Sequence, residues 1–324
     1  MFDTKYTYAV ARIRALETSL FTSQIIDQLL ACETEEQCIQ ILQEKGWGDN
    51  DTGSAEAILE RETEKIWETM KDLGVDMSVF DVLSYPNLFH NLKAAIKDAC
   101  SGMDNQNLNI YYEDTQISPK EMLEIIKNKE FSRFPENMAG AAREAYETLL
   151  HTGDGQLCDV IIDRAALDAI YAAGEAAKDS IIKEYAESVV AIADIKIAVR
   201  SQKTAKTIEF MKRAMAPCKS INVDQLAKAA AAGMEAVTEY LSGTAYAEGG
   251  QAIAESSSAF ERWCDNRMMQ AMQPQKYESF SVGPLVAYVL ARENEIKTVR
   301  IILSGKQNGF SEESIRERVR EMYV

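Results

Sequence analysis

Apolar side chains recur at helical spacing along this chain, and long stretches contain no helix-breaking residue. Residues 175–216 include neither glycine nor proline, and Ile181, Tyr185, Val189 and Ile192 follow one another at intervals of three or four. This spacing predicts an amphipathic helix of about 25 residues or more, about 40 Å long. A second apolar stripe near the C-terminus consists of Leu285, Val289, Ile296, Val299 and Leu303.

One short pattern of polar and apolar positions occurs three times. A polar residue, an aliphatic residue and a lysine begin the segments NLKAAIK, DIKIAVR and EIKTVRI, whose first residues are Asn91, Asp194 and Glu295. The lysines, Lys93, Lys196 and Lys297, are 103 and 101 residues apart. Self-similarity at a nearly fixed period indicates that one supersecondary unit is used repeatedly.

Two further features accompany each copy in the same order. An acidic residue lies in another helix-like segment 31 to 33 residues before each lysine, and these residues are Glu62, Asp163 and Asp265. After each copy, a break is followed by a residue type that caps helices, at Ser118, Asn222 and Ser311. We therefore predict three similar helical domains, at residues 1–114, 115–218 and 219–324.

The third copy departs from strict equivalence with the other two. Its next helix start follows the lysine after 14 residues instead of 25 or 26, and Arg300 stands one position earlier than Lys97 and Arg200. The threefold repeat is therefore expected to be imperfect.

Composition favours long helices and a large core. Apolar residues make up 46% of the 324 residues, while 6 prolines and 16 glycines interrupt them. The formal net charge of -16 opposes binding to nucleic acid or to an anionic membrane surface. Half of this excess lies in residues 33–64, where a solvated helical face is favoured over a docking site for a basic partner.

Location can be predicted from the apolar runs and the cysteines. Charged residues break every long apolar run, as in SVVAIADIKIAVR, so no membrane span is expected. The first residues, MFDTKYTYAVARIRALE, lack the apolar core of a secretory signal. Six cysteines form no CxxC pair, which favours buried free thiols in a reducing compartment. These features predict a cytoplasmic protein.

Catalytic and metal-binding patterns are scarce, and we assign no catalytic, cofactor-binding or metal-binding residue. The two histidines, His90 and His151, belong to no HExxH or ExxH pattern, and His151 suits the end of a helix. Gln307 stands after Gly305-Lys306 where a phosphate loop needs Ser or Thr. An all-helical enzyme that uses carboxylates and a metal would need a DDxxD-like cluster, and none occurs.

The positive signal is a charged face on the last long helix. Glu293, Lys297 and Arg300 share this face at i, i+4 and i+7 and are candidates for contact with a partner. A Glu293–Lys297 pair would add only a few tenths of a kcal/mol of helix stability. The alternative is an ordinary solvated helix face. Lys93, Lys196 and Lys297 are equally consistent with pairing between helices of the same chain.

The C-terminal segment ARENEIKTVRIILSGKQNGFSEESIRERVREMYV resembles the C-terminal signature of the C subunits of V-type and A-type rotary ATPases, relatives of the eukaryotic d subunit. YTYAVARIRALETSLF resembles the first helix of this family, and YPNLFHNLKAAIK resembles its internal asparagine-leucine-lysine segment. The resemblance covers the whole chain and is most specific at its C-terminus.

The resemblance implies an all-α fold of three similar domains around a pseudo-threefold axis, forming a funnel. It implies a non-catalytic socket on the cytoplasmic face of the proteolipid ring, peripheral to the membrane. This socket would receive the D and F subunits of the central stalk and would couple ATP hydrolysis or synthesis to proton or sodium transport. No cofactor is implied. The alternative is a cytoplasmic helical adaptor unrelated to rotary ATPases.

Overall fold

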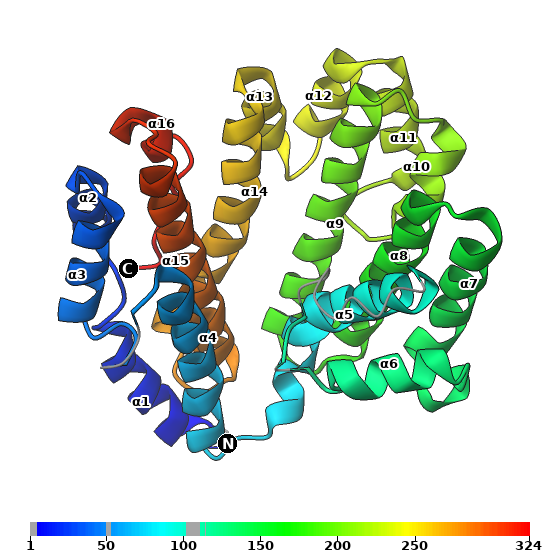
Figure 1. The fold of residues 1–324 in the computed structure, drawn as a ribbon. Coiled ribbons are helices and arrows are strands. Elements are labelled where there is room, and N and C mark those ends of the chain that lie inside the picture. Colours follow the sequence, from blue (N-terminus) through cyan, green and yellow to red (C-terminus); the bar gives the residue numbers. More distant parts are fainter. Residues whose placement is uncertain (1–4, 50–52, 102–110, 114) are drawn as a thin grey trace. The chain divides into compact units, whose positions relative to one another are not determined.

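The computed structural model describes residues 5–49, 53–101, 111–113 and 115–324. In these ranges all regular secondary structure is helical, which confirms the predicted all-α class (Figure 1). The chain forms two compact units: unit 1 comprises residues 1–77 and 248–324, and unit 2 comprises residues 78–247. Unit 2 is thus inserted between the two parts of unit 1 in sequence.

Unit 1 combines helices from both ends of the chain. In chain order its helices are α1 (Thr7–Glu17), α2 (Ser23–Ala31), α3 (Glu35–Glu44), α4 (Ala55–Asp72), α13 (Ala247–Glu255), α14 (Ser257–Met272), η3 (Gln273–Tyr277), α15 (Gly283–Gln307) and α16 (Glu312–Arg316). Most residues of α15 are buried, because α1 to α4, α14 and α16 all pack against it. The orange-to-red α15 lies beside the blue α4 in Figure 1. The last long helix therefore builds its core with the first segments of the chain.

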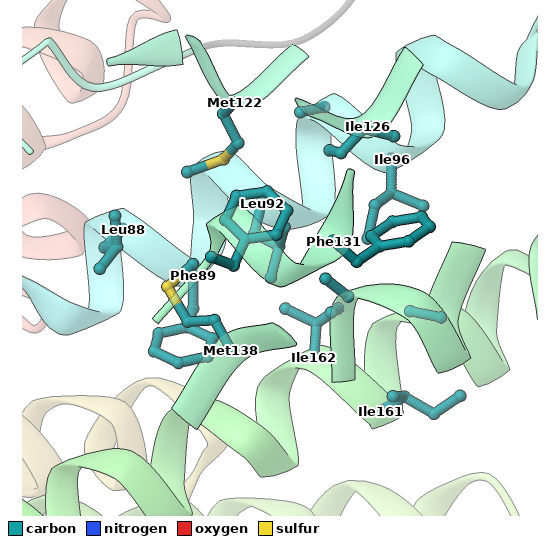
Figure 2. Close-up of a cluster of buried hydrophobic side chains, with 14 of the residues drawn as sticks. Leu88, Phe89, Leu92, Ile96, Met122, Ile126, Phe131, Met138, Ile161 and Ile162 are labelled. Carbon is teal, nitrogen blue, oxygen red and sulfur yellow. The ribbon is translucent and has the colours of Figure 1, made fainter. Parts of the chain in front are cut away.

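Unit 2 is arranged around α8. Its helices are α5 (Asp81–Ser101), α6 (Pro119–Lys127), η2 (Phe131–Arg133), α7 (Glu136–Thr152), α8 (Gly155–Ala176), α9 (Ser180–Lys203), α10 (Ile208–Ala214), α11 (Val223–Ala232) and α12 (Met234–Ser242), and η1 (Met77–Phe80) lies at the unit boundary. Helices α5, α7, α9 and α10 all contact α8. Figure 2 shows part of the resulting core, with Phe89 and Leu92 of α5 near Met138 of α7 and Ile162 of α8.

The three predicted helix starts are confirmed. Ser118, Asn222 and Ser311 are the N-caps of α6, α11 and α16, and each side-chain oxygen accepts a hydrogen bond from the backbone N–H three residues later. The donor–acceptor distances are 3.3, 3.0 and 3.2 Å. Such a cap satisfies a helix-end N–H group that would otherwise lack a partner.

The predicted long helices are present, with small differences in their ends. Helix α9 has 24 residues and α15 has 25. The chain leaves α9 without a glycine or proline, because Ala205 adopts a left-handed conformation at φ 52°. His151 lies in the last turn of α7, which ends at Thr152 before Gly153, as predicted. Gly305 lies within α15, where its lack of a side chain leaves room for Ile315.

The long helices pack against helices that come from other copies of the repeat. The repeated segments lie on α5, α9 and α15, and the acidic residues that precede them lie on α4, α8 and α14. Helix α5 packs against α8, and α15 packs against α4, so helices from different sequence copies are partners. The division into domains at 1–114, 115–218 and 219–324 stays a prediction, and residue 114 lies outside the described residues.

Candidate functional site

The polar side chain that begins each repeated segment is hydrogen-bonded to the backbone of another part of the chain. These three side chains, Asn91, Asp194 and Glu295, are 0%, 0% and 2% exposed. They accept backbone N–H hydrogen bonds from Tyr112 at 2.9 Å, Ala216 at 3.0 Å and Phe21 at 2.6 Å, respectively. A buried polar group must be paired to avoid a large desolvation cost. The shared polar position is therefore a structural anchor in all three copies.

The lysine of the first copy pairs with the acidic residue of the second. Lys93 Nζ lies 2.7 Å from Asp163 Oδ1, and Lys97 Nζ lies 2.6 Å from Asp159 Oδ1. Both pairs join α5 to α8, and their order along the two helices shows that the helices run antiparallel. Lys196, on α9, and Lys93 line the same cavity of about 600 Å³ in unit 2.

The lysine of the third copy also pairs with a carboxylate of another helix, which is one of the alternatives that the sequence left open. Lys297 Nζ lies 2.6 Å from Asp265 Oδ2 of α14, and Arg320 Nε donates to the same oxygen at 2.7 Å. Burial acts to raise the pKa of Asp265, but the two cations outweigh it and hold that pKa below its usual range. Asp265 is therefore a carboxylate with two cationic partners at neutral pH.

The charged face of α15 is held partly by contacts within unit 1. Arg300 Nη1 lies 2.8 and 2.7 Å from the two carboxylate oxygens of Glu56 on α4. The side chains of Lys297 and Arg300 are each 49% exposed. Glu293 is exposed, and among the described residues it has no ion-pair partner. Despite the favourable spacing of Glu293 and Lys297, the cations of this face pair with α14 and α4.

A buried charge network on α4 and α15 was missed by sequence reasoning. Arg292 donates to both Glu62 and Glu295, and its guanidinium lies 5.2 Å from the centre of the Trp47 ring. Glu62 also accepts the backbone N–H of Gly48 at 2.8 Å. Burial raises the pKa of Glu295 to about 7, against the opposing effect of Arg292. Glu62 and Glu295 had a sequence signal, because they occupy the repeated acidic and polar positions, whereas no part of the repeat indicated Arg292.

Asp194 is the corresponding buried carboxylate of α9, and it has no direct cation partner among the described residues. Its Oδ1 accepts the Ala216 N–H, whereas its Oδ2 has no hydrogen-bond partner in the described structure. Burial raises the pKa of Asp194 to about 7, although the Ala216 N–H and Arg164 act to lower it. This carboxyl group therefore changes its charge near neutral pH.

Metal-binding clusters and membrane-crossing helices are both absent from the described ranges. No three His, Cys, Asp or Glu side chains there gather closely enough to hold a metal ion together. In those ranges none of the helices has the length and apolar character needed to cross a bilayer. The six cysteines are free thiols, and burial raises the pKa of Cys158 to about 11.

Comparison with known proteins matches almost the whole chain to one family. The sequence model for the ATP synthase (C/AC39) subunit matches residues 9–318. The C subunit of the V-type sodium ATPase of Enterococcus hirae is 25% identical over 320 residues, which cover 96% of this chain and 97% of that protein. The C subunit of the A-type ATP synthase of Methanocaldococcus jannaschii is 22% identical over 341 residues, covering 96% and 85%.

Proposed function

Because the chain belongs to the ATP synthase (C/AC39) subunit family, we propose that it is a non-catalytic central-stalk subunit of a V-type or A-type ATPase. The observation that carries this proposal is the family match over residues 9–318. Two relatives that are named as C subunits of such ATPases align over 96% of the chain. The match argues against a helical adaptor unrelated to rotary ATPases.

In this role the protein is a socket between the stalk and the membrane sector. It seats on the cytoplasmic side of the proteolipid ring and receives the D and F subunits of the central stalk, so that ATP hydrolysis or synthesis is linked to proton or sodium transport. The long helices α9 and α15 support a torque-bearing role, because extended packing between helices resists deformation. The net charge of -16 suits docking on a protein ring better than adsorption to anionic lipid.

Three similar domains around a pseudo-threefold axis, forming a funnel, belong to the same proposal. Support comes from the equivalent roles of Asn91, Asp194 and Glu295, each of which anchors backbone from another part of the chain. The caps at Ser118, Asn222 and Ser311 add a second equivalence.

Glu293, Lys297 and Arg300 are the proposed contact residues on α15. Lys297 and Arg300 are half exposed, so each charge reaches solvent while Asp265 or Glu56 restrains the side chain. A restrained side chain loses less conformational entropy on binding than a free one. Charges placed in a row also fix the orientation of a partner more than they add affinity.

Co-purification tests the proposed function. The tagged full chain is expressed in its native host, and complexes are isolated from gently solubilised membranes and identified by mass spectrometry. We expect a proteolipid together with stalk and ATPase-head subunits, and none of these from a host that carries the tag alone. Recovery of the chain by itself, or with unrelated soluble proteins, would contradict the proposal.

A further inference from the structure

Unit 2 contains a cavity that the proposed stalk and ring contacts do not use. Its volume is about 600 Å³, and its lining comes from α5, α8, α9 and the segment that leads into and forms α10. This volume lies within the range of typical small-molecule sites, about 300–1,000 Å³. The size alone therefore permits a small ligand.

The cavity is apolar at one end. The Lys93–Asp163 and Lys97–Asp159 pairs fix the register of α5 on α8, and this register places Pro86 and Phe89 level with Leu167 and Ile170. Gly174 packs against Ala186 where α8 turns back into α9, which brings Val189 and Ala193 to the same end. This end offers hydrocarbon contacts from three helices.

The other end is cationic. Lys93, Lys196, Arg200 and Lys206 line the cavity toward the N-terminus of α8 and the C-terminus of α9. The only carboxylates in the described lining are Asp159 and Asp163, which Lys97 and Lys93 already neutralise. A positive cluster of this kind stands out in a chain whose net charge is -16.

Two of these cations are placed to receive a ligand. Within the described ranges the Arg200 guanidinium makes no hydrogen bond or ion pair, and its side chain is exposed. Lys206 Nζ donates to Gln156 Oε1 at 2.7 Å and lies 5.1 Å from the centre of the Phe210 ring. The Lys206–Gln156 contact joins two walls of the cavity at its cationic end.

We infer that this cavity binds a single-chain anionic amphiphile, with a carboxylate or phosphate head at Arg200 and Lys206 and an apolar tail beside Phe89 and Leu167. Burial of the tail supplies affinity, and charge-assisted hydrogen bonds to the head fix its direction. A nucleotide fits less well, because its polar base would lie against the apolar end.

Binding to the isolated full-length chain tests this inference without any ATPase partner, so its failure is distinct from failure of the proposed function. Oleate and 1-oleoyl-lysophosphatidate, below their critical micelle concentrations, are the probes, and calorimetry measures their affinities. Oleyl alcohol tests the tail without charge, and inorganic phosphate tests the charge without a tail. We expect both anionic probes to bind and both controls to bind at least about tenfold more weakly.

Matched charge reversals locate the head group. Arg200→Glu removes a lining cation, and Arg213→Glu makes the same charge change on α10 outside the cavity. We expect R200E to weaken binding of both anionic probes at least about tenfold and R213E to leave it unchanged. Ala193→Phe fills the tail end and should weaken both, with circular dichroism confirming the fold of every variant.

Several outcomes would overturn the inference. Equal binding of oleate and oleyl alcohol would remove the role of the cations, and equal losses in R200E and R213E would place the head elsewhere. Binding of phosphate as tight as that of lysophosphatidate would indicate an adventitious ion only. Binding of an acidic amphipathic helical peptide, with no binding of either anionic amphiphile, would identify the cavity as a docking groove for a protein.

Discussion

Asp194 and Glu295 occupy the same position in two copies of the repeat, yet their surroundings differ. Both are buried carboxyl groups that accept one backbone N–H. Glu295 of unit 1 also receives the guanidinium of Arg292, whereas Asp194 of unit 2 has no direct cation partner among the described residues. In both copies a buried side chain accepts a hydrogen bond from the backbone of another segment. Among the described residues, a cation also pairs with that side chain only in the third copy.

The first copy shows that the hydrogen bond between anchor and backbone does not require a charged side chain. Asn91 accepts the Tyr112 N–H and returns a hydrogen bond from Nδ2 to the Tyr112 carbonyl oxygen at 2.8 Å. An amide can supply both a donor and an acceptor, while an ionised carboxylate can only accept. The comparison therefore predicts that the three anchors respond differently when a charge is removed or introduced beside them.

Removing Arg292, the cation that pairs with the anchor Glu295, should have the largest effect on stability. Arg292→Met leaves Glu62 and Glu295 buried without their shared partner, so we expect a loss of about 3–5 kcal/mol in the free energy of unfolding. Urea unfolding at neutral pH measures this loss. Arg300→Gln, which removes a half-exposed partner of Glu56, is the control and should cost at most about 1 kcal/mol. An equally small loss for R292M would show that the network is not needed.

Asp194 should make the stability of unit 2 depend on pH. Its pKa in the folded chain, about 7, lies above the value of 3.8 expected when unfolded, so folding binds a proton between these values. The resulting stability is present below pH 4 and is lost as pH rises toward 7, by about 2–3 kcal/mol between pH 5 and 8. Asp194→Asn should remove this loss.

The measurement is the difference between wild type and D194N in urea unfolding across pH 5 to 8, which cancels the contributions of all other groups. Asp159→Asn, at a half-buried carboxylate paired with Lys97, is the matched control. Parallel pH profiles for wild type and D194N would reject the assignment to Asp194.

Introducing a charge at the first anchor, Asn91, is the converse test. Asn91→Asp replaces the donor to the Tyr112 carbonyl with an oxygen and introduces a carboxylate without a cation. We expect a loss of about 2 kcal/mol at pH 8 and a smaller loss at pH 5, where the new carboxyl group holds its proton. Thermal unfolding at the two pH values measures both. Equal losses at pH 5 and pH 8 would show that charge is not the cause.

The exposed pairs should matter least for folding and most for assembly. Lys297→Glu with Arg300→Glu removes two cations that are each about half exposed, and Asp265 keeps Arg320 as a partner, so we expect a cost of about 1 kcal/mol in stability. Attachment to the ATPase complex should weaken, as measured by co-purification from membranes. Lys212→Glu with Arg213→Glu, on α10, has the same net charge and is the control. Unchanged assembly of the α15 variant would reject these contact residues.

Sequence patterns predicted features that depend on neighbours within a few residues. The caps at Ser118, Asn222 and Ser311 are confirmed, because a side chain meets an N–H group only three residues away. The length of α9, 24 residues, is close to the predicted 25, and the chain leaves this helix through Ala205 in a conformation that usually belongs to glycine.

Contacts between distant segments could not be predicted in the same way. Arg292 and Glu62 are 230 residues apart, and no local pattern indicates that α15 packs on α4. Lys297 has a favourably spaced glutamate at Glu293, yet it pairs with Asp265 because α14 packs beside it. Exposed helix pairs contribute little, so tertiary packing decides which partner a charged side chain takes.

The insertion of unit 2 into unit 1 has a consequence for synthesis of the protein. Residues 78–247 form one continuous unit and can fold as soon as they leave the ribosome. The partners of α15 in α1 to α4 are made first, but they cannot complete their core until residues 283–307 are translated. During that interval their apolar faces have no native partner, which makes them candidates for chaperone binding on the nascent chain.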